Sequence, residues 1–424
     1  MIRFLFKGLL RDRSRSLVPL FIVAIGVMLS VFLYCYLLGL MGDMIDLNAR
    51  FATGHVKIMT QAYADHQEQN PNDLALLETS ALMDDLEKEF PAMDWVQRIN
   101  FGGLIDVPDN YGETKAQGTV FGTAYDLITA STTEVERLNL KNSLIKGWLP
   151  EKKDELLLSD DLALKLKLSP GQTVTLIAST MYGGMAIYNF RVAGTVKFGS
   201  AALDQSGIIA DLQGIKEALD MEDACGEILG YLEVEHYNDV KAQQVQHTFN
   251  KKFHDPEDEF SPVMKRLKEQ SFLSGYLDMV DSMQGLIITL FIMVMAIVLW
   301  NTGLIGGLRR YGEIGVRLAI GENYHHIYAS MIYEALLIGI VGSCLGTIVG
   351  LAFAYWVQEV GIDISGMMRN NTLMMQSVFR AKITPPAFYI GFIPGLLAIV
   401  LGTMLSGIGI YKRKTAHLFK ELET

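Results

Sequence analysis

Apolar residues in this chain gather in four long runs, one near the N-terminus and three in the C-terminal third, with a largely polar stretch between them. Each run is long enough to cross a bilayer as a helix, which takes about 20 apolar residues. The pattern therefore predicts an α-helical membrane protein with four transmembrane helices and a large α+β domain outside the membrane. The predicted spans are 17–41, 283–308, 327–358 and 386–411, and the outer domain is 42–275.

The outer segment mixes two periodicities, which predicts that it contains both strands and helices. Alternating or β-branched patches predict strands at 55–59, 118–121, 172–178, 190–196 and 231–234. Amphipathic stretches predict helices at 81–90, 160–168, 214–219 and 239–253. We expect the interval of about 127–225 to form an inserted, mostly β lobe.

Basic residues predict the orientation of the spans. Several precede the first span, and others follow the second and fourth. The positive-inside rule then places both termini, the connection 309–326 and the tail 412–424 in the cytoplasm, and the domain and the loop 359–385 outside. Residues 1–16 also repeat a basic residue every fourth position opposite an apolar face. That spacing fits an amphipathic helix on the inner membrane surface, or a basic tail that only sets topology.

The charge of the outer segment excludes some functions. Residues 42–275 carry 37 Asp and Glu against 21 Lys and Arg, a net charge of −16, whereas a nucleic-acid-binding domain needs a basic face. The histidines have no metal-ligand spacing, and no signature of a hydrolase or metalloprotease occurs. We therefore expect no enzyme, no metal site and no nucleic-acid binding in this domain.

Methionines gather near the outer ends of the spans, including Met367, Met368, Met374 and Met375 in the loop 359–385. Thioethers can bind copper(I). Methionine more often supplies an adaptable apolar surface that accepts varied cargo, and we favour that interpretation.

The connection between the second and third spans reads RRYGEIGVRLAIG at 309–321. A solvated connector is rarely so apolar, so we expect this segment to dock against another surface. Glu334 falls about one turn inside the third span, where a carboxylate is costly unless it is paired or near the interface. Either it reaches the headgroups or pairs with a nearby arginine, or it takes part in coupling, and the pattern leaves both open.

The third span carries Gly342, Gly346 and Gly350, spaced four residues apart. Small residues at this spacing leave a groove in which another helix can approach closely, so we expect helix packing here. Four spans also leave apolar faces uncovered, which favours a dimer.

The whole layout, together with the segment YGEIGVRLAIG at 311–321, resembles the MacB/LolC/LolE/FtsX permeases, the membrane subunits of type VII ABC transporters. The resemblance covers essentially the whole chain, and LLLSDDLALKLKLSPG at 156–171 is similar to the lobe inserted in the MacB-like periplasmic core. Residues 39–58 are similar to the start of LolC/LolE outer domains, which favours the lipoprotein-release branch. The resemblance implies a bacterial inner membrane location, with the large domain in the periplasm.

The resemblance also implies a separate ABC ATPase as partner. The sequence contains no GxxxxGK[ST] motif, so we expect the partner to bind ATP and Mg, and this chain to bind no cofactor. The coupling residues that the family motif implies are Glu313, Ile314, Gly315, Arg317, Ala319, Gly321 and Glu334.

The family is described as working by mechanotransmission, in which ATP binding inside drives closure of the outer domains. The outer ends of the first two spans would then line a hydrophobic cargo cavity, open to membrane lipid, between two subunits. Its expected residues are Phe32, Leu33, Tyr36, Leu37, Leu40, Met283, Ile287 and Leu290.

Four functions remain open from the sequence. The favoured one is extraction of a lipoprotein or other hydrophobic cargo from the outer leaflet, with a second copy or a paralogous permease and a periplasmic acceptor. The alternatives are MacB-like efflux of peptides or drugs through a periplasmic adaptor, and FtsX-like regulation of a cell-wall hydrolase. A receptor unrelated to ABC systems would leave the apolar segment at 309–321 unexplained.

Overall fold

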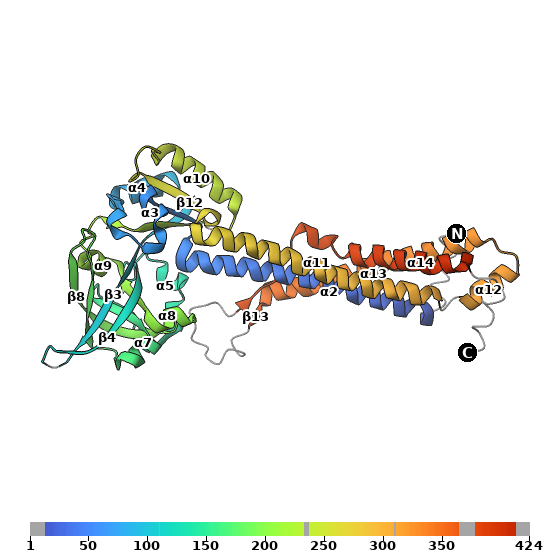
Figure 1. Cartoon of the computed structure of the whole chain (residues 1–424), viewed down its shortest axis with the longest axis horizontal. Helices are drawn as coiled ribbons and strands as arrows, with labels where there is room; N and C mark the ends of the chain where they lie inside the picture. Colours follow the sequence, from blue (N-terminus) through green and yellow to red (C-terminus); the bar gives the residue numbers. More distant parts are fainter. Residues whose placement is uncertain (1–12, 110, 233–236, 309–310, 364–377, 413–424) are drawn as a thin grey trace. The chain divides into compact units, whose positions relative to one another are not determined.

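The computed structural model describes residues 13–109, 111–232, 237–308, 311–363 and 378–412. The chain divides into two compact units (Figure 1). The membrane unit comprises Met1–Gly42, Asp278–Ile362 and Phe379–Thr424, and the outer unit comprises Asp43–Leu277 and Asp363–Val378. Residues 1–12 of the predicted N-terminal helix, the four loop methionines and residues 413–424 of the tail lie outside the described residues.

Long helices build the membrane unit. They are α2 (Arg13–Asn48), α11 (Ser271–Leu308), α13 (Tyr324–Val360) and α14 (Ile399–Lys412), with the short α12 (Tyr311–Ala319), the 3₁₀ turn η5 (Pro385–Phe388) and the π-helix η6 (Ile393–Ala398). Among the described residues, four segments are long and apolar enough to cross a membrane: Leu17–Thr53, Ser282–Gly306, Tyr324–Val360 and Pro385–Ile408. Helices α2 and α11 extend beyond the apolar runs at 17–41 and 283–308, because helical hydrogen bonding continues where the residues become polar.

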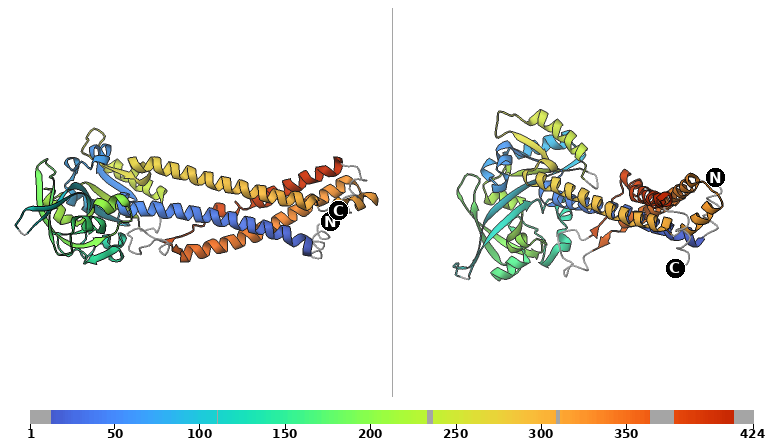
Figure 2. Two further views of the ribbon diagram at one scale, coloured as in Figure 1. Left: turned by 60° about the horizontal axis from the view of Figure 1, so that its bottom comes forward. Right: turned by 45° about the vertical axis from the view of Figure 1, so that its right-hand side comes forward.

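A stripe of fully buried side chains on α2 forms the centre of the membrane unit. Val23, Val27, Val31 and Cys35 recur every four residues and are all 0% exposed. They face the glycine stripe of α13. The ribbons of α2 (blue) and α13 (orange) lie beside each other in the membrane unit (Figure 2). A Cβ atom at Gly342 would lie 2.7 Å from Val23 Cγ1, and one at Gly350 would lie 3.1 Å from Val31 Cβ. The missing side chains of α13 therefore make room for the branched side chains of α2.

The fourth apolar segment meets the same stripe through a second pair of glycines. Gly391 and Gly395 approach Val27 so closely that a Cβ atom at Gly391 would lie 2.6 Å from Val27 Cγ1. Between them Pro394 lies in the first turn of η6, where a helix does not need the missing N–H. Val27 thus contacts both α13 and the η6 region, and the sequence pattern drew attention only to α13.

We expect Gly346→Leu to destabilise the membrane unit by about 1–3 kcal/mol, the usual cost of overpacking. A Cβ atom at Gly346 would lie 2.5 Å from the backbone oxygen of Ala24, which cannot move aside as a side chain can. The unfolding midpoint of the purified protein in a mild detergent measures the effect. Gly285→Leu in α11 is the matched control, because nothing lies within 4 Å of its Cβ position. Equal midpoints for the two variants would contradict the packing argument.

Strands of the outer unit form one ten-stranded sheet in which six strands close into a ring. The ring order is β3, β4, β9, β6, β8, β7 and back to β3. Its strands are β3 (Met93–Pro108), β4 (Thr114–Tyr125), β6 (Glu155–Ser159), β7 (Thr173–Ser179), β8 (Met185–Val196) and β9 (Gly207–Asp211). The ring encloses apolar residues such as Ile105, Leu158 and Phe190, and these belong to the main core cluster. Closure leaves these strands without a free edge.

The long strand β3 leaves the ring at its N-terminal half and continues the sheet as β3, β11, β1 and β12. These strands are β1 (Val56–Thr60), β11 (Glu227–Leu232) and β12 (Pro262–Arg266), and β5 (Leu144–Gly147) pairs with β8 at the other end. Two-residue ladders join β2 (Leu76–Leu77) to β10 (Ala224–Cys225) and β13 (Ile362–Asp363) to β14 (Val378–Phe379).

Helices of the outer unit are short apart from two (Figure 1). The longer ones are α4 (Thr79–Glu89) and α10 (Asp239–Phe253). The shorter ones are α3 (Gln61–Asp65), α5 (Glu134–Arg137), α6 (Leu140–Ser143), α7 (Asp160–Leu166), α8 (Ala201–Ser206) and α9 (Leu212–Ala218). Single turns are η1 (Ala49–Thr53), η2 (Gln67–Gln69), η3 (Asn72–Leu74) and η4 (Leu267–Glu269).

Most of the predicted elements of this unit are confirmed. The four predicted helices correspond to α4, α7, α9 and α10, and the strands predicted up to residue 232 correspond to β1, β4, β7, β8 and β11. The prediction missed β3, β5, β6, β9 and β12. Of these, β6 and β9 are buried along their whole length and therefore show no alternation. Two strands within 127–225 pair with strands before it, β7 with β3 and β9 with β4, so the sheet continues across the boundary expected for an inserted lobe.

His55 gives the outer unit a pH-dependent stability. Its ring is buried, its Nδ1 accepts a hydrogen bond from the Leu232 N–H at 2.9 Å, and the edges of Tyr231 and Tyr237 flank it. Burial lowers the pKa of His55 below its ordinary value of 6.5, against the opposing effect of Asp46. The unfolded chain then binds more protons than the folded one as the pH falls through 6.5.

We therefore expect the stability of the outer unit to decrease as the pH is lowered from about 7 toward 5, and to depend less on pH in His55→Gln. The glutamine can accept the same hydrogen bond and does not titrate. The urea midpoint of the full-length protein at several pH values measures this. His66→Gln, at an exposed histidine, is the control. A pH profile of His55→Gln that matches the wild type would exclude His55 as the cause.

Candidate functional site

Helix α12 packs on the first turns of α13 through an apolar contact. Ile314 is only 2% exposed and clusters with Ile327 and Met331 of α13, while Leu318 packs against the same cluster. Gly315 is also buried. One face of the segment 311–319 is therefore covered by α13. This contact accounts for Ile314 and Leu318, half of the aliphatic residues that make 309–321 unusually apolar.

The turn between α12 and α13 is held by backbone bonds at both helix ends. Glu322 N–H donates to the Arg317 oxygen and Gly321 N–H donates to the Leu318 oxygen, each at 3.0 Å, which is the Schellman arrangement. Gly321 has φ +98°, a conformation that glycine adopts without strain. The Asn323 side chain then caps α13 by accepting the His325 N–H. Gly321 thus acts by ending α12.

Charged side chains tie the same turn together. Arg317 donates from Nε to Oε2 and from Nη2 to Oε1 of Glu322, both at 2.6 Å, and Oε1 also lies 2.7 Å from His326 Nδ1. The hydrogen bonds from Arg317, followed by the contact with His326, lower the pKa of Glu322 to about 2. The carboxylate is therefore ionised at physiological pH. The sequence analysis did not predict a role for Glu322 or His326. Their spacing indicates possible ion pairs, because Glu322 follows Arg317 by five residues and precedes His326 by four.

The outer face of α12 carries Glu313 and Val316, and Ile320, the residue that directly follows the helix, continues this face at helical spacing. Val316 is 45% and Ile320 81% exposed, so two branched aliphatic side chains lie uncovered beside a carboxylate. Ala319 is exposed next to them. Glu334 lies further along α13, half-buried, and is not a member of the apolar cluster that joins α12 to α13. The implied coupling residues therefore do not form one cluster. Ile314 and Gly315 are buried, Glu313 and Ala319 are exposed, Arg317 and Gly321 belong to the turn, and Glu334 lies apart on α13.

The residues expected to line a cargo cavity have two different environments. On α2, Phe32 packs on Phe353 of α13 with ring centroids 4.7 Å apart and on Tyr36 at 5.9 Å. All five α2 residues of this set, Phe32, Leu33, Tyr36, Leu37 and Leu40, are half-buried. On α11, Met283, Ile287 and Leu290 are 40–58% exposed. The α11 residues thus present an open apolar surface, while Phe32 and Tyr36 already have aromatic partners within the chain.

Ligand chemistry for a metal is not evident in the described parts of the chain. No group of three or more His, Cys, Asp or Glu residues among them is placed to hold an ion. The three cysteines are free thiols, and burial raises the pKa of Cys225 to about 12. Cys225 is therefore a buried, protonated thiol.

Residues 285–415 match the family model described as FtsX-like permease C-terminal. The C-terminal third of the chain is therefore similar to the C-terminal part of FtsX-like permeases. The match includes α12, the turn with Gly321 and the glycine stripe of α13.

One of the similar solved structures is the periplasmic region of another protein. The periplasmic region of MacB from Actinobacillus actinomycetemcomitans is similar at 13% identity with a TM-score of 0.35, over 55% of this chain and 95% of that one. At this TM-score the similarity supports no conclusion about fold or function. The comparison with curated proteins found no match.

We expect Glu322→Gln to loosen the end of α12. Loss of the charge weakens both hydrogen bonds from Arg317, so amide hydrogen exchange at 318–322 should rise about threefold, as for an exposed ion pair. Hydrogen exchange measured by mass spectrometry on the full-length protein reports this. Glu359→Gln, at an exposed glutamate near the other end of α13, controls for the loss of charge. Unchanged exchange at 318–322 would show that the backbone bonds alone hold the turn.

Proposed function

We propose that this chain is the membrane (permease) subunit of an ABC transporter and couples a separate ATPase to work outside the membrane. The observation that supports this most directly is the match of residues 285–415 to the FtsX-like permease model, a match that includes α12 and its uncovered aliphatic side chains. The ATPase binds ATP and Mg, and this chain contributes no catalytic residue and no cofactor site.

The docking surface in this proposal is the outer face of α12, formed by Glu313, Val316 and Ile320. A force applied there passes to α13, because Ile314 and the Arg317–Glu322–His326 contacts join the two helices. From α13 it passes to α2, because the glycine stripe leaves no space for one helix to move independently of the other. The coupling roles of Gly315, Ala319 and Glu334 belong to this proposal.

The work in this proposal is extraction of a lipoprotein or another hydrophobic cargo from the outer leaflet of the inner membrane. The uncovered apolar side chains of α11, with Met283, Ile287 and Leu290 among them, suit contact with acyl chains. A second copy of the chain or a paralogous permease completes the cavity, and the outer unit lies in the periplasm, where an acceptor or adaptor receives the cargo.

We expect Ile320→Asp, alone or with Val316→Asp, to abolish co-purification of the ATPase and its stimulation by the permease. A carboxylate buried at the centre of an apolar contact weakens binding by about 1–3 kcal/mol or more. The affinity for the ATPase should therefore fall by several-fold to orders of magnitude. The matched control is Ile187→Asp, which makes the same change at an isoleucine that is 65% exposed in the outer unit. Full ATPase recovery with both α12 variants would count against this docking surface.

The cargo and the partner are tested together by purifying the tagged protein in a mild detergent and identifying what accompanies it by mass spectrometry. An ATPase with acylated proteins supports lipoprotein release. An ATPase with a periplasmic adaptor supports efflux, and an ATPase with a cell-wall hydrolase supports a regulatory role. Recovery of no ATPase, even after crosslinking from α12, would overturn the ABC proposal.

A further inference from the structure

The first long helix ends inside the outer unit, where its last carbonyl groups need partners. Helix α2 runs to Asn48 and continues as the π-helical turn η1, Ala49–Thr53, which stops at Gly54 with φ +61°. A helix leaves its last four carbonyl oxygens without partners inside the helix. Here Gly54 N–H donates to the Ala49 oxygen at 2.8 Å, and the oxygens that follow must be satisfied by other groups.

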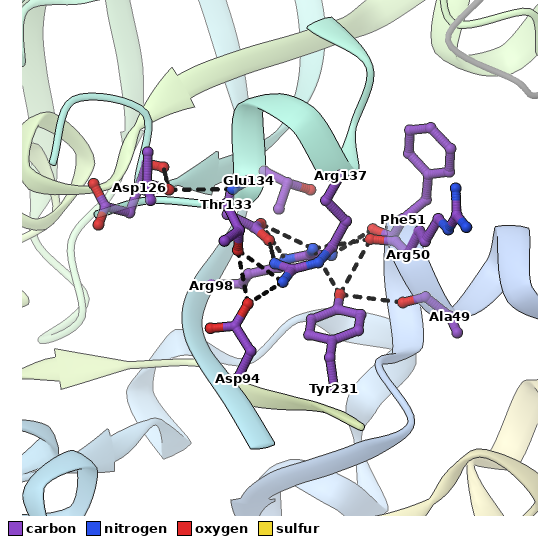
Figure 3. A network of polar contacts seen from close by, with 12 residues as sticks. Ala49, Arg50, Phe51, Asp94, Arg98, Asp126, Thr133, Glu134, Arg137 and Tyr231 are labelled. Atoms are coloured by element: carbon purple, nitrogen blue, oxygen red, sulfur yellow. Dashed lines mark hydrogen bonds and ion pairs between the residues drawn. The ribbon is translucent and has the colours of Figure 1, made fainter. Parts of the chain in front are cut away.

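Arg98 on β3 supplies these partners (Figure 3). Its Nη1 donates to the Phe51 oxygen at 2.7 Å and its Nη2 donates to the Arg50 oxygen at 2.9 Å. The Tyr231 hydroxyl, which accepts a hydrogen bond from Arg98, lies 3.2 Å from the oxygens of Ala49 and Arg50. A buried guanidinium therefore caps the negative end of the helix, the position where a cation is favoured.

The position of Arg98 is itself fixed by surrounding groups. Glu134, which is fully buried, accepts from Arg98 Nε at 3.2 Å and from Nη2 at 2.9 Å, and the Tyr125 ring lies 4.7 Å below the guanidinium. Arg137 in turn pairs with Glu134 and with Asp94. Burial lowers the pKa of Arg98, but Tyr231 and Glu134 raise it by more, so the charge is kept. Five donors in a planar fork allow arginine to hold a carboxylate and two carbonyls together, which lysine cannot do.

The start of the second long helix is tied to the same turn. Gln270, which directly precedes α11 and is buried, donates from Nε2 to the Thr53 oxygen at 3.1 Å. The Leu267 N–H donates to the His55 oxygen at 3.3 Å, and β1 pairs along its whole length with β12. Within the outer unit, the strand that follows α2 and the strand that precedes α11 are therefore neighbours in one sheet.

We propose that Arg98 is a positioning residue that fastens the end of α2 to the outer sheet, so that a displacement of the first span moves β3 and β11 with it. This inference rests on the proposed function for the source of the displacement, while the attachment itself concerns the outer unit alone. Arg98 is suited to the task because it lies on β3, the strand shared by the ring and by the β3–β11–β1–β12 extension. One side chain therefore joins the helix end to both parts of the sheet.

The test uses hydrogen exchange of the full-length protein in lipid nanodiscs. Arg98→Met with Glu134→Gln removes the capping donors without leaving a buried, unpaired carboxylate. We expect exchange of the amides at 48–55 to rise about tenfold or more, as for a helix end that opens locally. Arg98→Lys keeps the charge beside Glu134 and loses the fork, so it serves if the double variant does not fold, with an expected rise of about threefold.

The matched control is Lys57→Met with Glu227→Gln. These residues form another buried ion pair of the same sheet, 2.9 Å apart and 3% and 2% exposed, and the contacts found for them do not include the η1 carbonyls. The control should leave exchange at 48–55 unchanged. If the Arg98 variants exchange there no faster than the control, Arg98 does not hold the helix end and the inference is wrong.

Transmission is tested by adding a non-hydrolysable ATP analogue to the complex with the ATPase. We expect the wild type and the control to change their exchange both at α12 and in β3 and β11. The Arg98 variants should respond at α12 but not in the strands. A strand response that survives a loosened helix end would overturn the role of Arg98. No response at α12 in the wild type would instead contradict the proposed function. The exchange measured without nucleotide would still test whether Arg98 holds the end of α2.

Discussion

Helix ends inside folded protein leave carbonyl oxygens that must find donors, and this chain meets the requirement in two ways. At Gly321 the backbone itself supplies the donors, in a turn that needs only a glycine and its neighbours. At Thr53 the donors come from side chains of β3, β11 and the start of α11. The first kind of end makes a compact local turn, whereas the second joins distant parts of the chain. In the buried charge cluster, the Arg98 guanidinium donates to the carbonyls of this second end, and Glu134 balances its charge.

Helix packing in the membrane unit follows a different constraint. Lipid provides no hydrophobic driving force between helices, so close van der Waals contact has to bring them together. Val23, Val27 and Val31 fill the space left by the glycines of α13, and Val27 also reaches Gly391 and Gly395. A region packed this closely transmits displacement rather than absorbing it. The irregular η6 turn at Pro394 is tolerated because it lies against these buried neighbours.

The proposed coupling path combines these two kinds of contact. Helix α12 presents Val316 and Ile320 outward and anchors itself on α13 through Ile314, so docking and anchoring use opposite faces of one short helix. The family match covers this helix and the three C-terminal apolar segments. Under the proposal, the helix bundle carries motion along its glycine-lined contacts, and the capped end of α2 passes it to the sheet of the outer unit.

Much of this could be predicted from the sequence where the determining signal is local. Hydropathy runs of about 20 residues identify segments able to cross a membrane whatever surrounds them. The strands with clean alternation and the amphipathic helices of the outer unit were also predicted, since periodicity reports one buried face. The apolar character of 309–321 indicated a contact, but its division into an inner and an outer face required the position of α13.

Tertiary structure alone decided the features that join residues far apart in the chain. Arg98 and Glu134 are 36 residues apart and Arg98 and Tyr231 are 133 apart, and neither spacing distinguishes them from surface residues. Closure of the six-stranded ring depends on β7 pairing with both β3 and β8, and β6 and β9 are buried on both faces, so no alternation marks them. The glycine stripe could be read from the sequence, but the valines that fill it are ordinary members of an apolar run until α2 lies against α13.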